Sequence, residues 1–270
     1  MSKIKVIKSS GVIEPFSEEK LMHSLKAAGV DNVLSRWVTE KIKQKIKGTI
    51  STQFIHNKAL EILQSEKAVF AMRYKLKAAI MELGPTGHPF EKLVGWILRA
   101  MGYDAKTNVL IQGKCVRHEV DVIGEKDGKR IMVEAKYHNE RGIKSDVKVA
   151  MYVYARFLDI NFVEKLDEGW LITNTKLTSD AKQYASCVGL KAIGWNYPAG
   201  ENLQRLIEVN HLFPLTVLKT LSFENKRKLL DAGLVLAKEI TGDKLNQLPI
   251  KNQVKKQIQA EIQELMEVKI

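Results

Sequence analysis

Residues 118–137 read HEVDVIGEKDGKRIMVEAKY, and this stretch decides the fold. It contains two runs rich in Val, Ile and other strand-forming residues, 118–123 and 130–137. The residues between them, 125–128, favour a turn. The pattern predicts a β-hairpin whose strands carry acidic residues among apolar ones.

The second strand of this hairpin carries an acid and a base on one face. Side chains alternate between the faces of a strand, so Glu134 and Lys136 point the same way, whereas Ile131, Val133 and Ala135 point the other way. Antiparallel pairing through the turn brings Asp121 near Glu134. Two carboxylates and a lysine favour phosphodiester hydrolysis, because carboxylates bind Mg²⁺ and the amine stabilises charge developing on a phosphate. Glu91, on a predicted helix, can add a further oxygen.

The same spacing also fits a solvated ion pair between Glu134 and Lys136 on an exposed strand. The apolar residues 120–123 and 131–133 favour a buried sheet, in which carboxylates need a partner or a metal. Spacing alone leaves both interpretations open.

A central block extends outward from the hairpin. Apolar residues three and four apart predict a helix from Phe90 to Met101. Further strands are predicted at 107–112, 169–174 and 190–194, and further helices at 145–157 and 179–188. Segments that contain Gly and Pro, at 84–87 and 198–200, mark the two ends of this block. Residues 88–200 are therefore predicted to form a mixed sheet flanked by helices.

The flanking blocks are predicted to be mainly helical. Residues 1–84 begin with a short hairpin and continue as four helices at about 17–28, 35–47, 52–63 and 69–83, with Ser17 and Thr52 as N-caps. Residues 201–270 are predicted to be all helical, ending in an exposed amphipathic helix over 251–268. The fold class is α/β: a mainly helical N-terminal domain, a central mixed sheet and a helical C-terminal region.

Composition limits the function classes. The chain has 270 residues and a net charge of +12, which favours DNA or nucleotides as partners and equally fits a soluble protein of high pI. No apolar run approaches the ~20 residues of a membrane span, and no secretory signal is recognised. The distant Cys115 and Cys187 fit a reducing cytoplasm and exclude a four-cysteine zinc ribbon.

Asp121 together with Glu134-Ala135-Lys136 resembles the metal site of the PD-(D/E)XK nucleases, specifically the Mrr-like restriction endonucleases. The resemblance covers about residues 89–198 and includes the stretches 90–93, 118–122, 133–138 and 172–174. It implies that Asp121 and Glu134 are ligands of Mg²⁺, or of Mn²⁺ in its place. It also implies that Lys136 is the catalytic lysine and Glu91 a helix-borne acid. The chain departs from the family at Ala135, where cysteine is frequent.

Residues 6–11 and 14–17 with Lys20 resemble the opening of an ATP-cone, the nucleotide-sensing domain of ribonucleotide reductases and their repressors. The resemblance covers about residues 3–83 and departs at Ser9, where the family often has arginine. It implies an adenine nucleotide, ATP or dATP, as a regulatory ligand. The implied contacts are Lys8, Lys20, Thr52 and His56, with Glu14 near the base or ribose. The chain has no Walker-type motif, which argues against hydrolysis by a P-loop.

The C-terminal block carries weaker signals. Residues 210–214 and 229–234 are faintly similar to a helix-hairpin-helix, and a plain helical cap fits them as well. The cluster 226–228, Lys-Arg-Lys, either grips phosphate or is solvated. The last helix is expected to mediate oligomerisation, because cutting both strands of a duplex needs two active sites.

These observations predict a cytoplasmic, Mg²⁺-dependent DNA endonuclease, a homodimer or larger oligomer, that is regulated by ATP or dATP. Two alternatives remain: a nucleotide-gated DNA-binding regulator on an inactive nuclease fold, and a Holliday-junction resolvase. The DNA sequence preference, the biological pathway and the direction of the nucleotide effect do not follow from the sequence.

Overall fold

The structure is a computed structural model that describes residues 4–8, 10–28, 30–66, 68–140 and 142–267. The chain forms two compact units. The first comprises Met1–Ala78, Val217–Thr220 and Pro249–Ile270, and the second comprises Ala79–Thr216 and Leu221–Leu248. Residues 201–270 are thus divided between the two units.

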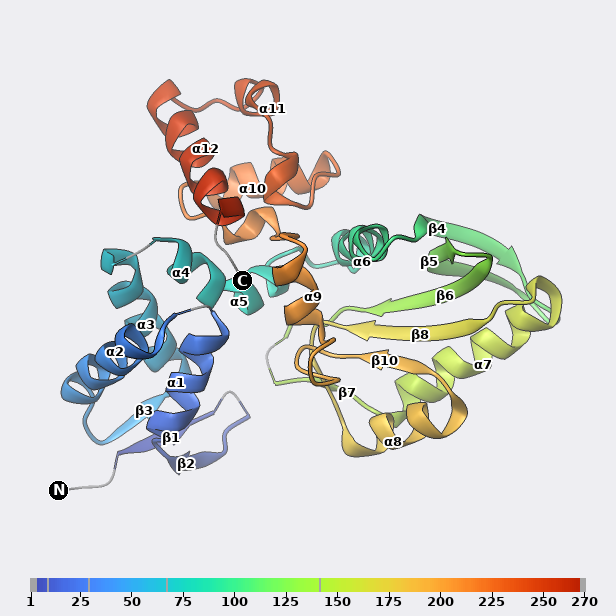
Figure 1. Ribbon diagram of the computed structural model, residues 1–270, viewed down its shortest axis with the longest axis horizontal. Coiled ribbons are helices and arrows are strands. Elements are labelled where there is room, and N and C mark those ends of the chain that lie inside the picture. The colour runs from blue at the N-terminus through green and yellow to red at the C-terminus, as the bar shows by residue number, and fades with distance from the viewer. Residues whose placement is uncertain (1–3, 9, 29, 67, 141, 268–270) are drawn as a thin grey trace. The chain divides into compact units, whose positions relative to one another are not determined.

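The first unit combines a small sheet with helices (Figure 1). Strands β1 (Lys5–Ile7) and β2 (Ile13–Pro15) form the predicted antiparallel hairpin. Strand β3 (Thr49–Ser51) pairs in parallel with β1. The sequence pattern did not predict β3. The helices are α1 (Glu18–Ala27), α2 (Asn32–Lys45), α3 (Thr52–Glu66), α4 (Ala68–Tyr74) and α12 (Asn252–Glu267).

Several helix boundaries differ from those predicted; helix α2, for example, begins three residues earlier. Ser17 caps α1 as expected, its Oγ accepting a hydrogen bond from the Lys20 backbone N–H. The predicted N-cap of α3 is wrong by one residue, because the hydroxyl of Ser51, and not that of Thr52, accepts a hydrogen bond from the Phe54 N–H. The single helix predicted over 69–83 is instead α4 followed by α5 (Leu76–Met81).

The last helix is amphipathic as predicted, and its apolar stripe is covered by another part of the chain. Its residues Ile258 and Leu265 are fully buried. Helix α12 packs against α4 within the first unit, although the two are far apart in sequence. The apolar stripe therefore stabilises this unit, so it no longer supports oligomerisation.

The second unit is built on a five-stranded mixed sheet of order β10-β8-β6-β5-β4. Its strands are β4 (Asp104–Gln112), β5 (Arg117–Lys126), β6 (Lys129–Lys136), β8 (Glu168–Thr173) and β10 (Lys191–Ile193). Strands β4, β5 and β6 are antiparallel, whereas β6, β8 and β10 are parallel. Two short strands, β7 (Lys144–Ser145) and β9 (Lys176–Leu177), pair separately and were not predicted.

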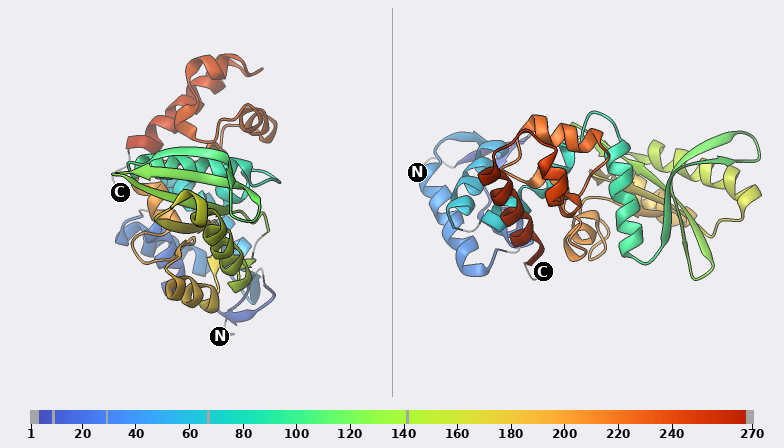
Figure 2. Two further views of the ribbon diagram at one scale, coloured as in Figure 1. Left: turned by 90° about the vertical axis from the view of Figure 1, so that its right-hand side faces the viewer. Right: turned by 90° about the horizontal axis from the view of Figure 1, so that it is seen from above.

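Helices cover both faces of this sheet (Figures 1 and 2). Helix α6 (His88–Ala100) lies on one face, and α7 (Val147–Glu164) and α8 (Ser179–Val188) lie on the other. The predicted apolar stripe of α6 is fully buried, at Phe90, Leu93, Val94, Ile97 and Leu98. The central sheet flanked by helices is therefore as predicted, with burial on both faces of β6.

The remaining helices of the C-terminal segment are short: α9 (Leu203–Val209), η1 (Leu215–Val217), α10 (Phe223–Asp231), η2 (Ala237–Glu239) and α11 (Gly242–Asn246). Lys226 is buried and donates to the Thr216 carbonyl, so it does not grip phosphate. The N–H groups of Gly233 and Leu234 bond back to α10, as in a helix C-cap. This turn therefore lacks the free donors of a phosphate-binding helix-hairpin-helix. In the described part of the chain, no helix is both long and apolar enough to cross a membrane.

Candidate active site

The hairpin turn sets which residues of β5 and β6 face one another. Asp127 and Gly128 adopt positive φ values of 51° and 76° and close a two-residue turn between the paired Lys126 and Lys129. The register continues to Val122 opposite Val133. Asp121 and Glu134 are the next residues along the two strands, so they lie beside one another.

The backbone holds Asp121 directly. Its Oδ2 accepts a hydrogen bond of 2.7 Å from the Ala135 N–H, the peptide that follows Glu134. Its strand neighbours Val120 and Val122 are fully buried, which fixes the strand on both sides. The Asp121 side chain therefore links β5 to the backbone of β6 directly beside Glu134.

The two carboxylates share a poorly solvated site. Burial raises the pKa of Asp121 to about 6, against the lowering effect of the Ala135 N–H. Burial raises the pKa of Glu134 to about 7, and the charge of Asp121 adds to this increase. Burial and mutual repulsion therefore disfavour the ionised pair, and a divalent cation bound by both carboxylates would offset these two effects.

Glu91 and Lys136 belong to the same cluster. Glu91 projects from the first turn of α6, where His88 Nδ1 lies 3.2 Å from its Oε2. Its charge helps to raise the pKa values of both Asp121 and Glu134, whereas the charge of Lys136 lowers that of Glu134. All four sequence-predicted site residues therefore lie within electrostatic reach of one another.

Arg156 is a further member that sequence reasoning missed. It lies on α7 with only 8% of its surface exposed, and its Nη1 donates to Glu134 Oε2 at 2.5 Å. Its Nη2 donates to the Glu119 carbonyl, and its guanidinium lies over the Tyr152 ring. A signal was present: Arg156 follows the buried Val153 by three residues and precedes the buried Ile160 by four, so it shares the apolar face of its helix.

The donor set fits a hard divalent cation. Among the described residues, no three His, Cys, Asp or Glu side chains gather into a ready-made metal cage. Mg²⁺, however, commonly uses one or two carboxylates and keeps several waters. Asp121 and Glu134 supply such a pair, and their mutual repulsion would be relieved by a cation.

Three of the residues assigned to nucleotide binding, Lys8, Glu14 and Lys20, are in contact in the first unit. Glu14 accepts from Lys8 at 2.7 Å and from Lys20 at 2.9 Å, and these two amines lower its pKa. Strand pairing aligns Ile7 with Ser51, so Lys8 and Thr52 leave the sheet at the same end. Ser9, the departure from the family pattern, lies outside the described residues.

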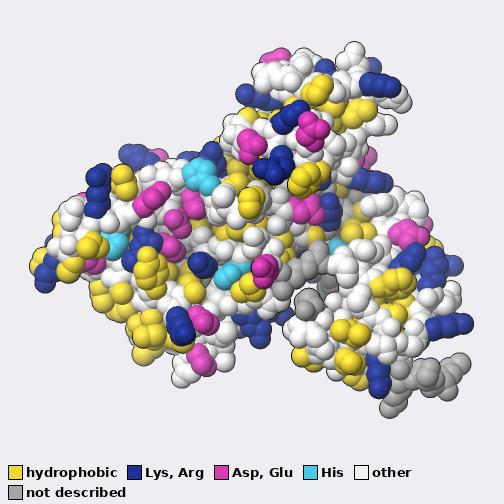
Figure 3. Space-filling view, turned by 180° about the vertical axis from the view of Figure 1, so that it is seen from behind, with side chains coloured by type: hydrophobic (Ala, Val, Ile, Leu, Met, Phe, Trp, Pro, Cys, Tyr) yellow, Lys and Arg dark blue, Asp and Glu magenta, His cyan; other side chains and the backbone are white. Residues whose placement is uncertain are grey.

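His56 lies one turn after Thr52 on α3. Its ring stacks on Tyr74 of α4, with ring centroids 4.8 Å apart. The charges of the chain are not gathered into one stripe on the face drawn in Figure 3, where basic side chains are dispersed among acidic and apolar ones. The net charge of +12 alone therefore identifies neither binding surface.

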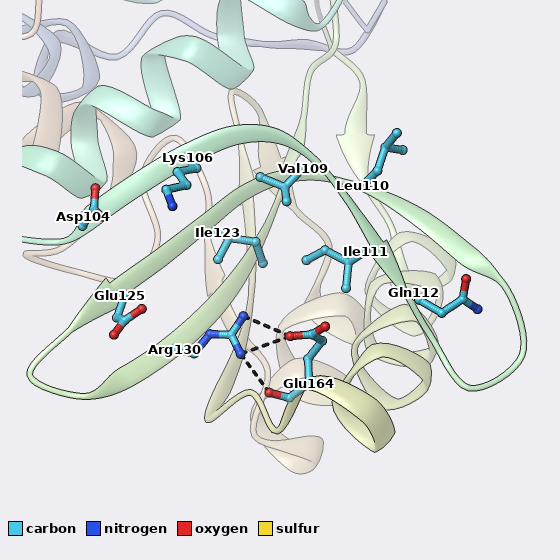
Figure 4. Close-up of a pocket in the computed structure, with 10 residues that line it drawn as sticks. All are labelled: Asp104, Lys106, Val109, Leu110, Ile111, Gln112, Ile123, Glu125, Arg130 and Glu164. Atoms are coloured by element: carbon cyan, nitrogen blue, oxygen red, sulfur yellow. Dashed lines mark hydrogen bonds and ion pairs between the residues drawn. The ribbon is translucent and has the colours of Figure 1, made fainter.

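A surface hollow of about 330 Å³ lies elsewhere in the second unit. Figure 4 shows it over β4, β5 and β6, with Val109, Ile111 and Ile123 among its lining residues and Arg130 paired with Glu164 at 3.1 Å. None of the sequence-predicted site residues lines this hollow. The hollow therefore contributes nothing to the candidate active site.

Three known sequence families match parts of the chain. Residues 84–196 match the restriction endonuclease family of the Mrr catalytic domain, and residues 4–78 match the ATP cone domain. Residues 213–266 match a third family, described as AF1548-like, C-terminal. The restriction endonuclease and ATP-cone resemblances recognised in the sequence are thus confirmed in one chain.

Individual proteins are also similar to parts of the chain. An uncharacterised protein of Archaeoglobus fulgidus is 39% identical over 175 residues, which cover 63% of this chain and 98% of the relative. A crystal structure of AF1548, a protein of unknown function, is similar with 36% identity and a TM-score of 0.57, covering 67% of this chain and 98% of that one. A repair endonuclease from Pyrococcus abyssi is 20% identical with a TM-score of 0.32, covering 40% and 46%.

Proposed function

Because the chain belongs to the AF1548-like family and joins an ATP-cone to an Mrr-type restriction endonuclease domain, we propose that it is a metal-dependent DNA endonuclease regulated by an adenine nucleotide. The observation that carries the proposal is the convergence of Asp121 and Glu134 from neighbouring strands with Lys136 beside them. The regulatory part rests on the ATP-cone match and the cluster of Lys8, Glu14 and Lys20.

Each residue of the cluster has a distinct part in the proposed reaction. Asp121 and Glu134 would hold Mg²⁺ or Mn²⁺, and Glu91 would contribute further negative charge. The metal would polarise the scissile phosphate and lower the pKa of a bound water. Lys136 would orient the attacking water or stabilise the charge that develops on the phosphate oxygens. Arg156 would keep Glu134 ionised and fix one of its two oxygens.

Metal-dependent cleavage of plasmid DNA tests this function. Supercoiled plasmid is expected to be converted to nicked and linear forms with Mg²⁺ or Mn²⁺, and to remain intact with EDTA. ATP or dATP is expected to change the rate. Nicked circles as the sole product would argue against a dimer that cuts both strands, and an intact plasmid under every metal condition would contradict the nuclease assignment.

One observation favours a second candidate, a nucleotide-gated DNA-binding regulator without catalytic activity. Arg156 already supplies Glu134 with a cationic partner, so the site is partly neutralised without a metal. The regulator would bind plasmid DNA in the same experiment without cutting it. A gel-shift measurement beside the cleavage assay therefore separates the two candidates.

Replacing Lys20 by alanine is expected to weaken the binding of ATP and dATP about tenfold or more, since it removes a charge-assisted contact to phosphate. Lys20 stands in the first turn of α1, and its amine contacts Glu14. Isothermal titration calorimetry measures the change. Lys26→Ala, an exposed lysine in the last turn of the same helix, is the matched control. Equal dissociation constants for both variants and wild type would rule out the assigned contact.

A further inference from the structure

The segments that follow β6 and β8 are joined by one side-chain amide. Asn174 Oδ1 accepts from the His138 N–H at 2.9 Å, and Asn174 Nδ2 donates to the His138 carbonyl at 2.8 Å. In a β-sheet, the N–H and the C=O of a residue are both bonded by the neighbouring strand, and here the Asn174 amide bonds both groups of His138. The amide therefore extends the pairing of β6 with β8 beyond its last register pair, Lys136 opposite Thr173.

Asn174 is itself held in a rigid frame. Its surface is only 1% exposed, and the next residue, Thr175, donates its N–H to Thr173 Oγ1. The Thr175 carbonyl accepts from the Trp195 N–H at 2.8 Å. A Cβ at Gly194 would lie 3.0 Å from that carbonyl, so the contact is close. The hydrogen bonds of Thr175 therefore fix the backbone beside Asn174, and the Asn174 amide in turn fixes His138 in the segment after β6.

Buried hydroxyls attach His138 a second time. Ser145 Oγ lies 3.0 Å from His138 Nε2 and donates to Thr173 Oγ1 at 3.0 Å. Ser145 and Thr173 are both fully buried. On the side before His138, the Tyr137 hydroxyl donates to the Met81 carbonyl. The residue two positions after Lys136 is thus fixed through its backbone and through its ring.

Lys136 needs such support, because its side chain has no rigid anchor of its own. A lysine carries about 2 kcal/mol of rotamer entropy, and Lys136 is exposed at the last paired position of β6. We propose that Asn174 is a positioning residue that fixes the end of β6 and thereby places the Lys136 amine beside Glu134. The inference rests on the proposed endonuclease function and adds a residue that acts through Lys136.

The variant Asn174→Ala tests the inference by kinetics. We expect kcat for DNA cleavage to fall about 10–100-fold, because small misplacements of a catalytic group are costly. KM and DNA affinity are expected to stay within about twofold, because protein–DNA affinity depends mainly on contacts to phosphates and Asn174 is too buried to make one. Ser222→Ala is the matched control: it removes the side-chain N-cap of α10 in the same unit, and the hydrogen bonds of Ser222 join it to Asn225 and Lys226 of that helix. A similar fall in kcat for both variants would overturn the proposal.

A second measurement does not depend on cleavage. Competitive labelling with an amine reagent, read by mass spectrometry, gives the reactivity of Lys136 relative to Lys129 at the other end of β6. We expect Asn174→Ala to change this ratio about threefold or more through local opening, and Ser222→Ala to leave it unchanged. An unchanged ratio in both variants overturns the positioning role. An inactive wild type with a ratio altered only by Asn174→Ala removes the endonuclease function and supports the positioning of Lys136.

Discussion

Replacing Lys136 by alanine is expected to reduce DNA cleavage about 10²–10³-fold, the usual cost of losing one group that stabilises a transition state. Lys136 is exposed at the end of β6, so its removal leaves the core intact. Its charge acts on Glu134, whose pKa it lowers. Cleavage is measured under single-turnover conditions, and binding by fluorescence anisotropy with Ca²⁺ in place of Mg²⁺.

The matched control is Lys129→Ala, which removes an exposed lysine from the first position of the same strand. Both variants lose one positive charge, so both are expected to bind DNA slightly more weakly. Only Lys136→Ala is expected to lose cleavage. Persistent cleavage by this variant would remove Lys136 from the candidate site and leave the fold assignment unaffected.

The part of the site carried by β5 and β6 could be predicted from sequence for a physical reason. Strand side chains alternate strictly, and a short turn restricts the register, so Asp121, Glu134 and Lys136 follow from local pattern. Arg156 comes from a helix that crosses the sheet, and its partner depends on how α7 packs. Its position on the apolar face of α7 is visible in the sequence, but the choice of Glu134 as partner is not.

The fold shows the same division between local and long-range information. Helix α6 and strands β4 to β6 have long periodic patterns, and all were predicted. Strands β3, β7 and β9 have two or three residues each and pair with strands distant in sequence, so neither an apolar run nor a hairpin turn marks them. The apolar stripe of α12 packs against α4, which lies far away in sequence, so the amphipathic pattern predicted the helix but not the element that covers it.

Replacing Arg156 by methionine is expected to lower the free energy of unfolding by about 3–5 kcal/mol at pH 8.5, because it leaves a buried carboxylate without its partner. The side chains of Arg156 and Glu134 are only 9% and 15% exposed. Methionine retains much of the apolar volume of the arginine stem, which limits the packing loss. Urea unfolding followed by circular dichroism measures the change.

The loss of stability is expected to depend on pH. Burial raises the pKa of Glu134 from the ordinary 4.5 to about 7, so the folded state binds this proton more tightly than the unfolded state does. The stability gained from protonation is complete below pH 4.5 and is lost as the pH rises through 7. Without Arg156, the pKa rises further. Arg156→Met is therefore expected to cost most above pH 8 and least near pH 5.

Two further variants identify the cause. The double variant Arg156→Met with Glu134→Gln is expected to recover most of the stability at pH 8.5, because no buried charge remains. Arg130→Met removes the more exposed pair with Glu164 and is expected to cost about 1 kcal/mol or less, with little pH dependence. Mg²⁺ is expected to stabilise Arg156→Met more than wild type at pH 8.5, since a cation bound by Asp121 and Glu134 replaces the missing charge. If Arg156→Met lost the same free energy of unfolding at pH 5 and at pH 8.5, Arg156 would stabilise the fold through packing and not through its charge interaction with Glu134.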